Sequence, residues 1–95
     1  MTKKFWRIVG YDSTSKIFER RLPFGVLSET EVERLLQRLV CRHLTSDEIT
    51  DGSLRRSNPA YRPLLELRRE RSGKFSISAG DNPHYIVSLV SEEKG

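Results

Sequence analysis

Few side chains in this sequence could support catalysis. The chain holds two histidines, His43 and His84, and one cysteine, Cys41. Two histidines exclude a His-rich metal site, and a catalytic triad would need one of them as its base. Neighbouring arginines favour a thiolate at Cys41, but the sequence places no base beside it. His43 falls within an apolar pattern typical of a hydrogen-bonded core or rim histidine. An enzyme that uses Cys41 or His43 is therefore our third hypothesis, behind two non-catalytic ones.

The acidic residues and the glycines follow no ligand-binding pattern. Asp47, Glu48 and Asp51 lie close together in the chain, but their spacing differs from that of a calcium loop. Helix capping is a sufficient reason for them. The six glycines are scattered and form no phosphate-binding or dinucleotide-binding motif. The sequence accordingly predicts no metal and no cofactor.

Arginine is the residue type that best suits a binding function here. Twelve of the seventeen cations are Arg, whose planar guanidinium group binds carboxylates and phosphates. Residues 55–74 carry seven cations against two acids, a surplus of five that exceeds the net charge of +4. Arginine also recurs every fourth residue over 34–42. The predicted binding residues are Arg34, Arg38, Arg42, Arg55, Arg56, Arg62 and Arg68.

Two classes of acidic partner fit such residues. We expect a small non-catalytic interaction domain whose basic surface docks on an acidic protein. The alternative is a nucleic-acid-binding domain that contacts the phosphate backbone. The arginines can also be explained without any partner being needed: Glu31, Glu66 and Glu70 lie close enough in sequence to neutralise several of them.

The elements that position these residues begin with a predicted hairpin. Residues 5–11 and 16–24 are rich in aromatic and β-branched side chains, and the polar residues 12–15 between them favour a turn. The expected cross-strand pairs are Ile8 with Phe18, Val9 with Ile17 and Arg7 with Glu19.

A helix is predicted to begin at Ser28. Ser28 and Glu31 have the spacing of a capping box. Apolar residues then recur along one side of the helix, which predicts a face packed on the sheet. These residues are Val32, Leu35, Leu36, Leu39, Val40 and Leu44. Residues 45–63 contain several helix-breaking pairs, such as Asn58-Pro59, and are expected to form an irregular loop.

A second hairpin and a fifth strand complete the expected fold. A loop of Arg71, Ser72 and Gly73 would pair Leu65 with Ala79, Leu67 with Ile77 and Arg69 with Phe75. The last strand adds Tyr85, Val87 and Leu89 to the same apolar side. Ile86 and Val90 face outward, where they predict a protein contact and a possible homodimer through the sheet. Alternatively, the loop over residues 45–62 covers them.

The predicted fold class is α+β. It has an antiparallel sheet of four to five strands, in the order β-β-α-β-β-β, with one amphipathic helix on one face. Residues 1–95 are expected to form a single domain with frayed ends at 1–4 and 91–95, and a chain of this length buries about 60–65% of its unfolded surface. Apolar runs never exceed three residues, so we expect no membrane partner. The single cysteine favours a cytoplasmic location.

Overall fold

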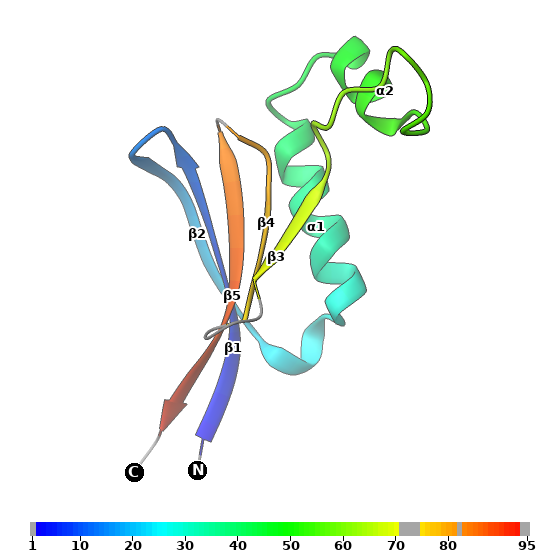
Figure 1. Ribbon diagram of the computed structural model, residues 1–95. Coiled ribbons are helices and arrows are strands. Elements are labelled where there is room, and N and C mark those ends of the chain that lie inside the picture. The colour runs from blue at the N-terminus through cyan, green and yellow to red at the C-terminus, as the bar shows by residue number, and fades with distance from the viewer. Residues whose placement is uncertain (1, 71–74, 82, 94–95) are drawn as a thin grey trace.

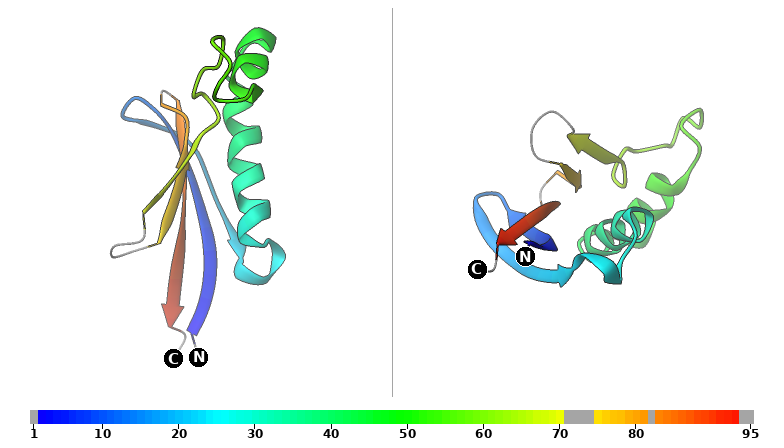
Figure 2. Two further views of the ribbon diagram at one scale, coloured as in Figure 1. Left: turned by 45° about the vertical axis from the view of Figure 1, so that its right-hand side comes forward. Right: turned by 90° about the horizontal axis from the view of Figure 1, so that it is seen from below.

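The computed structural model describes residues 2–70, 75–81 and 83–93. One antiparallel sheet has the strand order β2-β1-β5-β4-β3, and α1 packs on one of its faces, as Figures 1 and 2 show. The strands are β1 (Thr2–Asp12), β2 (Ser15–Pro23), β3 (Leu67–Glu70), β4 (Ser76–Ala79) and β5 (His84–Glu93). The helices are the 3-10 turn η1 (Phe24–Val26), α1 (Glu29–Cys41) and α2 (Ser46–Ser53). The predicted α+β class is therefore confirmed.

Helix α1 begins where its capping residues predict. The Ser28 hydroxyl accepts a hydrogen bond from the Glu31 backbone N–H at 3.2 Å, and the Glu31 carboxylate accepts one from the Ser28 backbone N–H at 2.9 Å. The second of these bonds lowers the pKa of Glu31, because it stabilises the charged carboxylate. This reciprocal pair fixes the first turn of α1 against the end of η1.

The core lies between α1 and one face of the sheet. Val32, Leu36 and Val40 are the buried residues of α1, as the apolar periodicity predicts. The sheet contributes side chains that alternate along its strands with those of the opposite face. These core residues are Trp6 and Ile8 of β1, Ile77 and Ala79 of β4, and Tyr85 and Val87 of β5.

The first hairpin forms, but the expected register is wrong. Ile8 pairs with Arg20, Val9 with Glu19 and Arg7 with Arg21. Two backbone features cause the shift: Ser13 adopts a left-handed φ of 59° in the turn, and the register slips between Gly10 and Tyr11. The slip places Phe18 opposite Gly10 rather than opposite Ile8.

The second hairpin is also shifted by two residues from its expected register. Leu67 pairs with Ala79 and Arg69 with Ile77, where Leu65 and Leu67 were the expected partners. The predicted loop at 71–73 lies outside the described residues. Both registers put Leu67 and Arg69 on the face that packs on α1, because a shift of two residues preserves the alternation.

Part of the segment expected to be an irregular loop is helical. Thr45 and Glu48 form a second capping box, with hydrogen bonds of 3.2 Å and 2.9 Å, and α2 follows. The bond from the Thr45 backbone N–H lowers the pKa of Glu48. Residues 54–63 contain no helix or strand, as expected, but residues 64–66 contain none either, although a strand was expected there.

Residues 2–4 and 91–93, which were expected to fray, belong to the sheet, and residues 1, 94 and 95 lie outside the described residues. Residues 2–4 of β1 pair with residues 91–93 of β5 and form a two-stranded ribbon that projects beyond the other strands (Figure 1). The chain is elongated as a result, with extents of 54 × 27 × 24 Å. Its radius of gyration is 14.8 Å, whereas about 12.4 Å is typical of a compact domain of this length.

Candidate functional site

Three of the predicted arginines form a row along the outer side of α1. Arg34 and Arg38 lie on the helix and Arg42 is its C-cap, and all three are exposed. Residues four apart are neighbours on a helix surface, so the three guanidinium groups share one face. None of the ion pairs among the described residues involves this arginine row. Arg34 adds to the lowering of the pKa of Glu31, to which the hydrogen bonds with Ser28 contribute more.

The other predicted arginines are not gathered with this row. Three of them have carboxylate partners: Arg56 with Glu66 at 2.8 Å, Arg62 with Glu48 at 4.0 Å, and Arg68 with Asp81 at 3.3 Å. Arg55 is exposed beyond the end of α2 and takes part in no ion pair within the described part of the chain. The structure thus divides the seven predicted arginines into a row of three, three paired residues and one separate residue.

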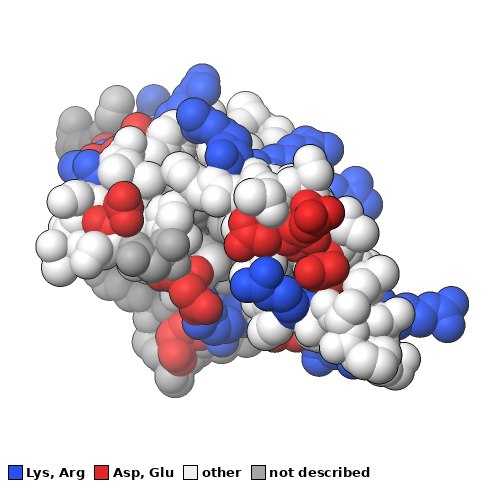
Figure 3. Space-filling view, turned by 90° about the horizontal axis from the view of Figure 1, so that it is seen from above, with Lys and Arg blue, Asp and Glu red and all other residues white. Residues whose placement is uncertain are grey.

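Charge is unevenly distributed on the end of the molecule that carries α2. In Figure 3, several basic side chains lie along the upper edge of the view, whereas acidic side chains cluster near its middle, with further basic side chains beside them. Near the middle of the view, acidic and basic side chains lie next to one another, so their charges partly cancel. The basic edge has no such acidic cluster in this view, so an acidic partner would meet less repulsion there.

Ile86 and Val90 lie on the face of the sheet opposite α1. Ile86 pairs with Val9 and Val90 pairs with Phe5, so four apolar side chains share this open face. Figure 2 shows α1 and the segment around α2 on the other side of the sheet, so this segment does not cover Ile86 or Val90. Both side chains are half-buried by their neighbours on the sheet.

Charged side chains lie on this open face as well as around it, because Arg7 stands on β1 between Phe5 and Val9, opposite Ser88. The Glu19 carboxylate accepts hydrogen bonds from Lys16 Nζ at 2.6 Å and from Arg7 Nε at 2.8 Å. These two cations lower the pKa of Glu19 to about 2. Arg21 binds Glu92 at 2.5 Å on the same face. The network fixes the charges at the edge formed by β2, which discourages pairing with another strand there.

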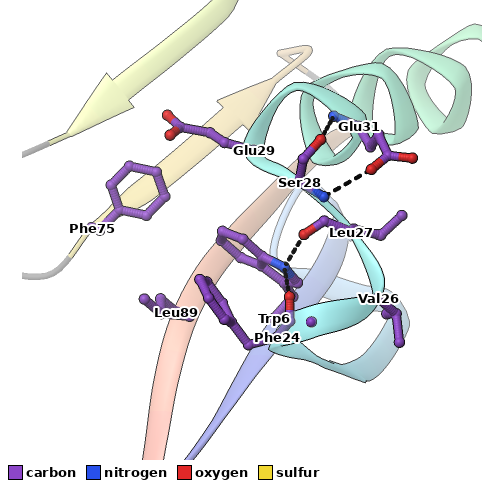
Figure 4. Close-up of a pocket in the computed structure, with 10 residues that line it drawn as sticks. Trp6, Phe24, Val26, Leu27, Ser28, Glu29, Glu31, Phe75 and Leu89 are labelled. Atoms are coloured by element: carbon purple, nitrogen blue, oxygen red, sulfur yellow. Dashed lines mark hydrogen bonds between the residues drawn. The ribbon is translucent and has the colours of Figure 1, made fainter.

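An apolar groove at the start of α1 was not predicted. It has a volume of about 720 Å³. Figure 4 shows the groove between the end of β2, the first turn of α1 and the sheet. Phe24 and Val26 at its rim are 44% and 54% exposed, which is unusual for large apolar side chains. The lining residues are Trp6, Phe24, Gly25, Val26, Leu27, Ser28, Glu29, Glu31, Phe75 and Leu89.

Trp6 holds this groove in shape. Its indole N–H donates to the backbone carbonyls of Phe24, at 3.2 Å, and Leu27, at 3.1 Å (Figure 4). Its ring packs against that of Phe24 with centroids 5.2 Å apart. The rigid connection from β2 to α1 therefore keeps Phe24 at the surface. The sequence Pro23-Phe24-Gly25 indicates a turn at this point of the chain. The exposure of Phe24, however, depends on its contact with Trp6, which is distant in sequence.

Of the residues that could support catalysis, His43 makes a contact with the core. Nε2 of His43 lies 2.7 Å from the Tyr85 hydroxyl. A cleft of about 160 Å³ joins His43 to Glu48 and Asp81. Glu48 caps α2 and Asp81 binds Arg68, and the hydrogen bond of His43 among the described residues is the one with Tyr85. Cys41 does not line this cleft. Within the described residues, no cluster of three or more His, Cys, Asp or Glu side chains could hold a metal ion.

Comparison with known proteins identifies no relative. No family model, curated protein or solved structure matches the chain. In the part of the chain that the structure describes, neither α1 nor α2 is long and apolar enough to cross a membrane. The function has to be inferred from the surfaces described above.

Proposed function

We propose that this protein is a small non-catalytic interaction domain that docks on an acidic protein through the arginine row of α1. One observation carries the proposal: Arg34, Arg38 and Arg42 are exposed on one helix face and, within the described residues, form no ion pair. Arginines with internal carboxylates need no partner, whereas this row has its hydrogen-bond donors available for one.

The helix makes the row a fixed array of donors. From Arg34 to Arg42 the helix rises about 12 Å, at about 1.5 Å per residue. Each guanidinium group can bind a carboxylate through two parallel hydrogen bonds. Because α1 is capped and packed on the sheet, the backbone loses little freedom when a partner binds. A partner with carboxylates spaced along a similar length would match this array.

Nucleic acid remains the alternative partner. Phosphate binding rests on the number of cations that contact the backbone, and the sequence predicts seven arginines for this role. Three of these arginines bind carboxylates within the chain, at Glu66, Glu48 and Asp81. Phosphates would have to displace those partners, so fewer contacts are available. This comparison favours an acidic protein.

Two triple variants with the same change in charge test the proposal. R34Q/R38Q/R42Q neutralises the row, whereas R56Q/R62Q/R68Q neutralises the three paired arginines. Fluorescence anisotropy of a labelled Asp/Glu-rich peptide and of a labelled DNA duplex would measure binding at several salt concentrations. We expect the row variant to weaken peptide binding about tenfold, since each exposed ion pair contributes about 0.2–1 kcal/mol.

The control variant should bind the peptide nearly as well as the wild-type protein does. Equal losses in both variants would mean that net charge alone drives binding, which contradicts the proposed site. Tighter binding of DNA than of peptide at every salt concentration would favour the nucleic-acid alternative.

A further inference from the structure

The apolar groove and the arginine row form one continuous surface. A smaller hollow of about 190 Å³ lies along α1 and is lined by Leu27, Glu31, Arg34, Leu35 and Arg38. Leu27 and Glu31 also line the apolar groove. A single occupant can therefore contact the groove at the start of α1 and the guanidinium groups further along the helix.

The groove offers apolar contacts and few unused polar groups. The Trp6 indole N–H, its main polar donor, is already bound to two backbone carbonyls. Of the rim carboxylates, Glu29 accepts a hydrogen bond from Arg69 and Glu31 accepts one from the Ser28 backbone N–H. The groove is thus suited to aliphatic or aromatic side chains.

The charges beside the groove indicate which residues should follow the apolar side chains in the sequence of an occupant. Arg34 and Arg38 line the adjoining hollow and have no ion-pair partner among the described residues. The half-exposed Phe24 and Val26 make the groove too shallow to enclose a small molecule, which normally buries about 70–90% of its surface. The complementary occupant is a protein segment with apolar residues next to acidic ones.

We propose that the groove and the arginine row together bind one linear segment of a partner protein, with two or three apolar side chains followed by carboxylates. This inference rests on the proposed function and adds the partner's sequence pattern to it. Ten residues of helix separate Ser28 from Arg38, which is a rise of about 15 Å. An extended chain covers that length in about five residues. The carboxylates should therefore lie within about five residues of the last apolar side chain.

A displayed library of random peptides of about 12 residues, a length that spans both hollows, is a direct probe. The library would be selected on the full chain, without counter-selection on F24S/V26S or R34Q/R38Q, so that both variants remain independent tests of the enriched peptides. Enriched peptides should carry apolar residues followed by Asp or Glu. Enrichment of peptides without acidic residues, or of basic peptides, would overturn the inference.

Trp6 then reports on the complex, because it is the single tryptophan of the chain and lines the groove. A Trp-free enriched peptide should shift its emission. F24S/V26S and R34Q/R38Q should each weaken binding about tenfold, with I17S, at another exposed apolar residue, as a control that binds normally.

The two variants separate this inference from the proposed function. If R34Q/R38Q weakens binding and F24S/V26S does not, the groove plays no part and only the arginine row remains as the docking site. If F24S/V26S weakens binding and R34Q/R38Q does not, both proposals are wrong. A shift in Trp6 emission with protein concentration alone, abolished by F24S/V26S, would mean that a second copy fills the groove, which also overturns the inference.

Discussion

The ring of Tyr85 lies against the backbone of Gly10. A Cβ atom at Gly10 would fall 2.4 Å from Cε2 of Tyr85 and 2.7 Å from its Cδ2. The two residues are partners on β1 and β5, and Tyr85 is 1% exposed. Phe18, which is opposite Gly10 on β2, meets the same ring edge-on with centroids 6.2 Å apart. The absence of a side chain at Gly10 therefore lets one aromatic ring pack across the middle of the sheet.

Gly10→Ala should destabilise the fold by about 1–3 kcal/mol, because the added methyl group cannot fit without moving Tyr85 or β1. Gly25→Ala is the matched control, since no atom lies within 4 Å of a Cβ at that position. Urea unfolding of both variants measures the difference. Equal stabilities of the two variants would contradict the close contact at Gly10.

Features that depend on neighbouring residues in the chain could be predicted from the sequence. The start of α1 follows from Ser28 and Glu31, three residues apart, whose hydrogen bonds are local. The buried face of the helix follows from a spacing that places Val32, Leu36 and Val40 on one side. The open face was also predicted correctly for Ile86 and Val90, because strand side chains alternate.

Features that depend on distant contacts could not be predicted. The register of β1 with β2 includes a slip beside Gly10, where the ring of Tyr85 from β5 packs against the backbone. The groove depends on Trp6 binding carbonyl groups eighteen and twenty-one residues further along. The division of the arginines is equally non-local, since Arg68 meets Asp81 only through the hairpin of β3 and β4.

The contact between His43 and Tyr85 should stabilise the end of α1. The Tyr85 hydroxyl is 2.7 Å from Nε2 of His43, and it connects the core to the residue after the helix C-cap. Tyr85→Phe should cost about 0.5–1.5 kcal/mol, because the ring still fills its site and one hydrogen bond is lost. His43→Ala should cost a similar amount.

A double-mutant cycle isolates this hydrogen bond from other effects of the two substitutions. The combined variant should lose less free energy of unfolding than the sum of the single losses, since both remove the same contact. Chemical denaturation measures all four proteins. Additive losses would mean that His43 and Tyr85 do not interact in solution.

Glu19 should make stability depend on pH in the acidic range. Lys16 and Arg7 lower the folded-state pKa of Glu19 to about 2 from an ordinary value of 4.5. A carboxyl group with a lowered folded-state pKa contributes stability that is fully present above its unfolded value and is lost as the pH falls through the folded value. The contribution should therefore decrease between about pH 4.5 and pH 2.

Comparison with Glu19→Gln tests this dependence. Thermal unfolding should give the wild-type protein the higher Tm above pH 4.5, and the difference should close as the pH approaches 2. High salt should reduce the difference at neutral pH, because these charges are exposed. A gap in Tm that stays constant over the whole range would exclude the linkage.

The open face of the sheet gives the last prediction, which is self-association. The accessible surface of 6621 Å² exceeds by about 1,000 Å² the value of about 5,600 Å² typical of a monomer of this mass. An elongated shape of 54 × 27 × 24 Å raises the accessible surface in this way and leaves the open face of the sheet uncovered. Phe5, Val9, Ile86 and Val90 lie on one face, so a two-fold axis could place this face against itself.

Sedimentation equilibrium should therefore show dimers of the 11.0 kDa chain that dissociate on dilution. I86K/V90K should shift the equilibrium to monomers, because two copies would bury like charges against each other. I17K is the control, since Ile17 is 44% exposed and does not belong to the four-residue cluster. A single monomeric species at concentrations up to about 1 mM, where even weak complexes form, would contradict this prediction. Circular dichroism of I86K/V90K distinguishes lost association from lost folding, because a monomer that keeps its sheet still reports on the interface.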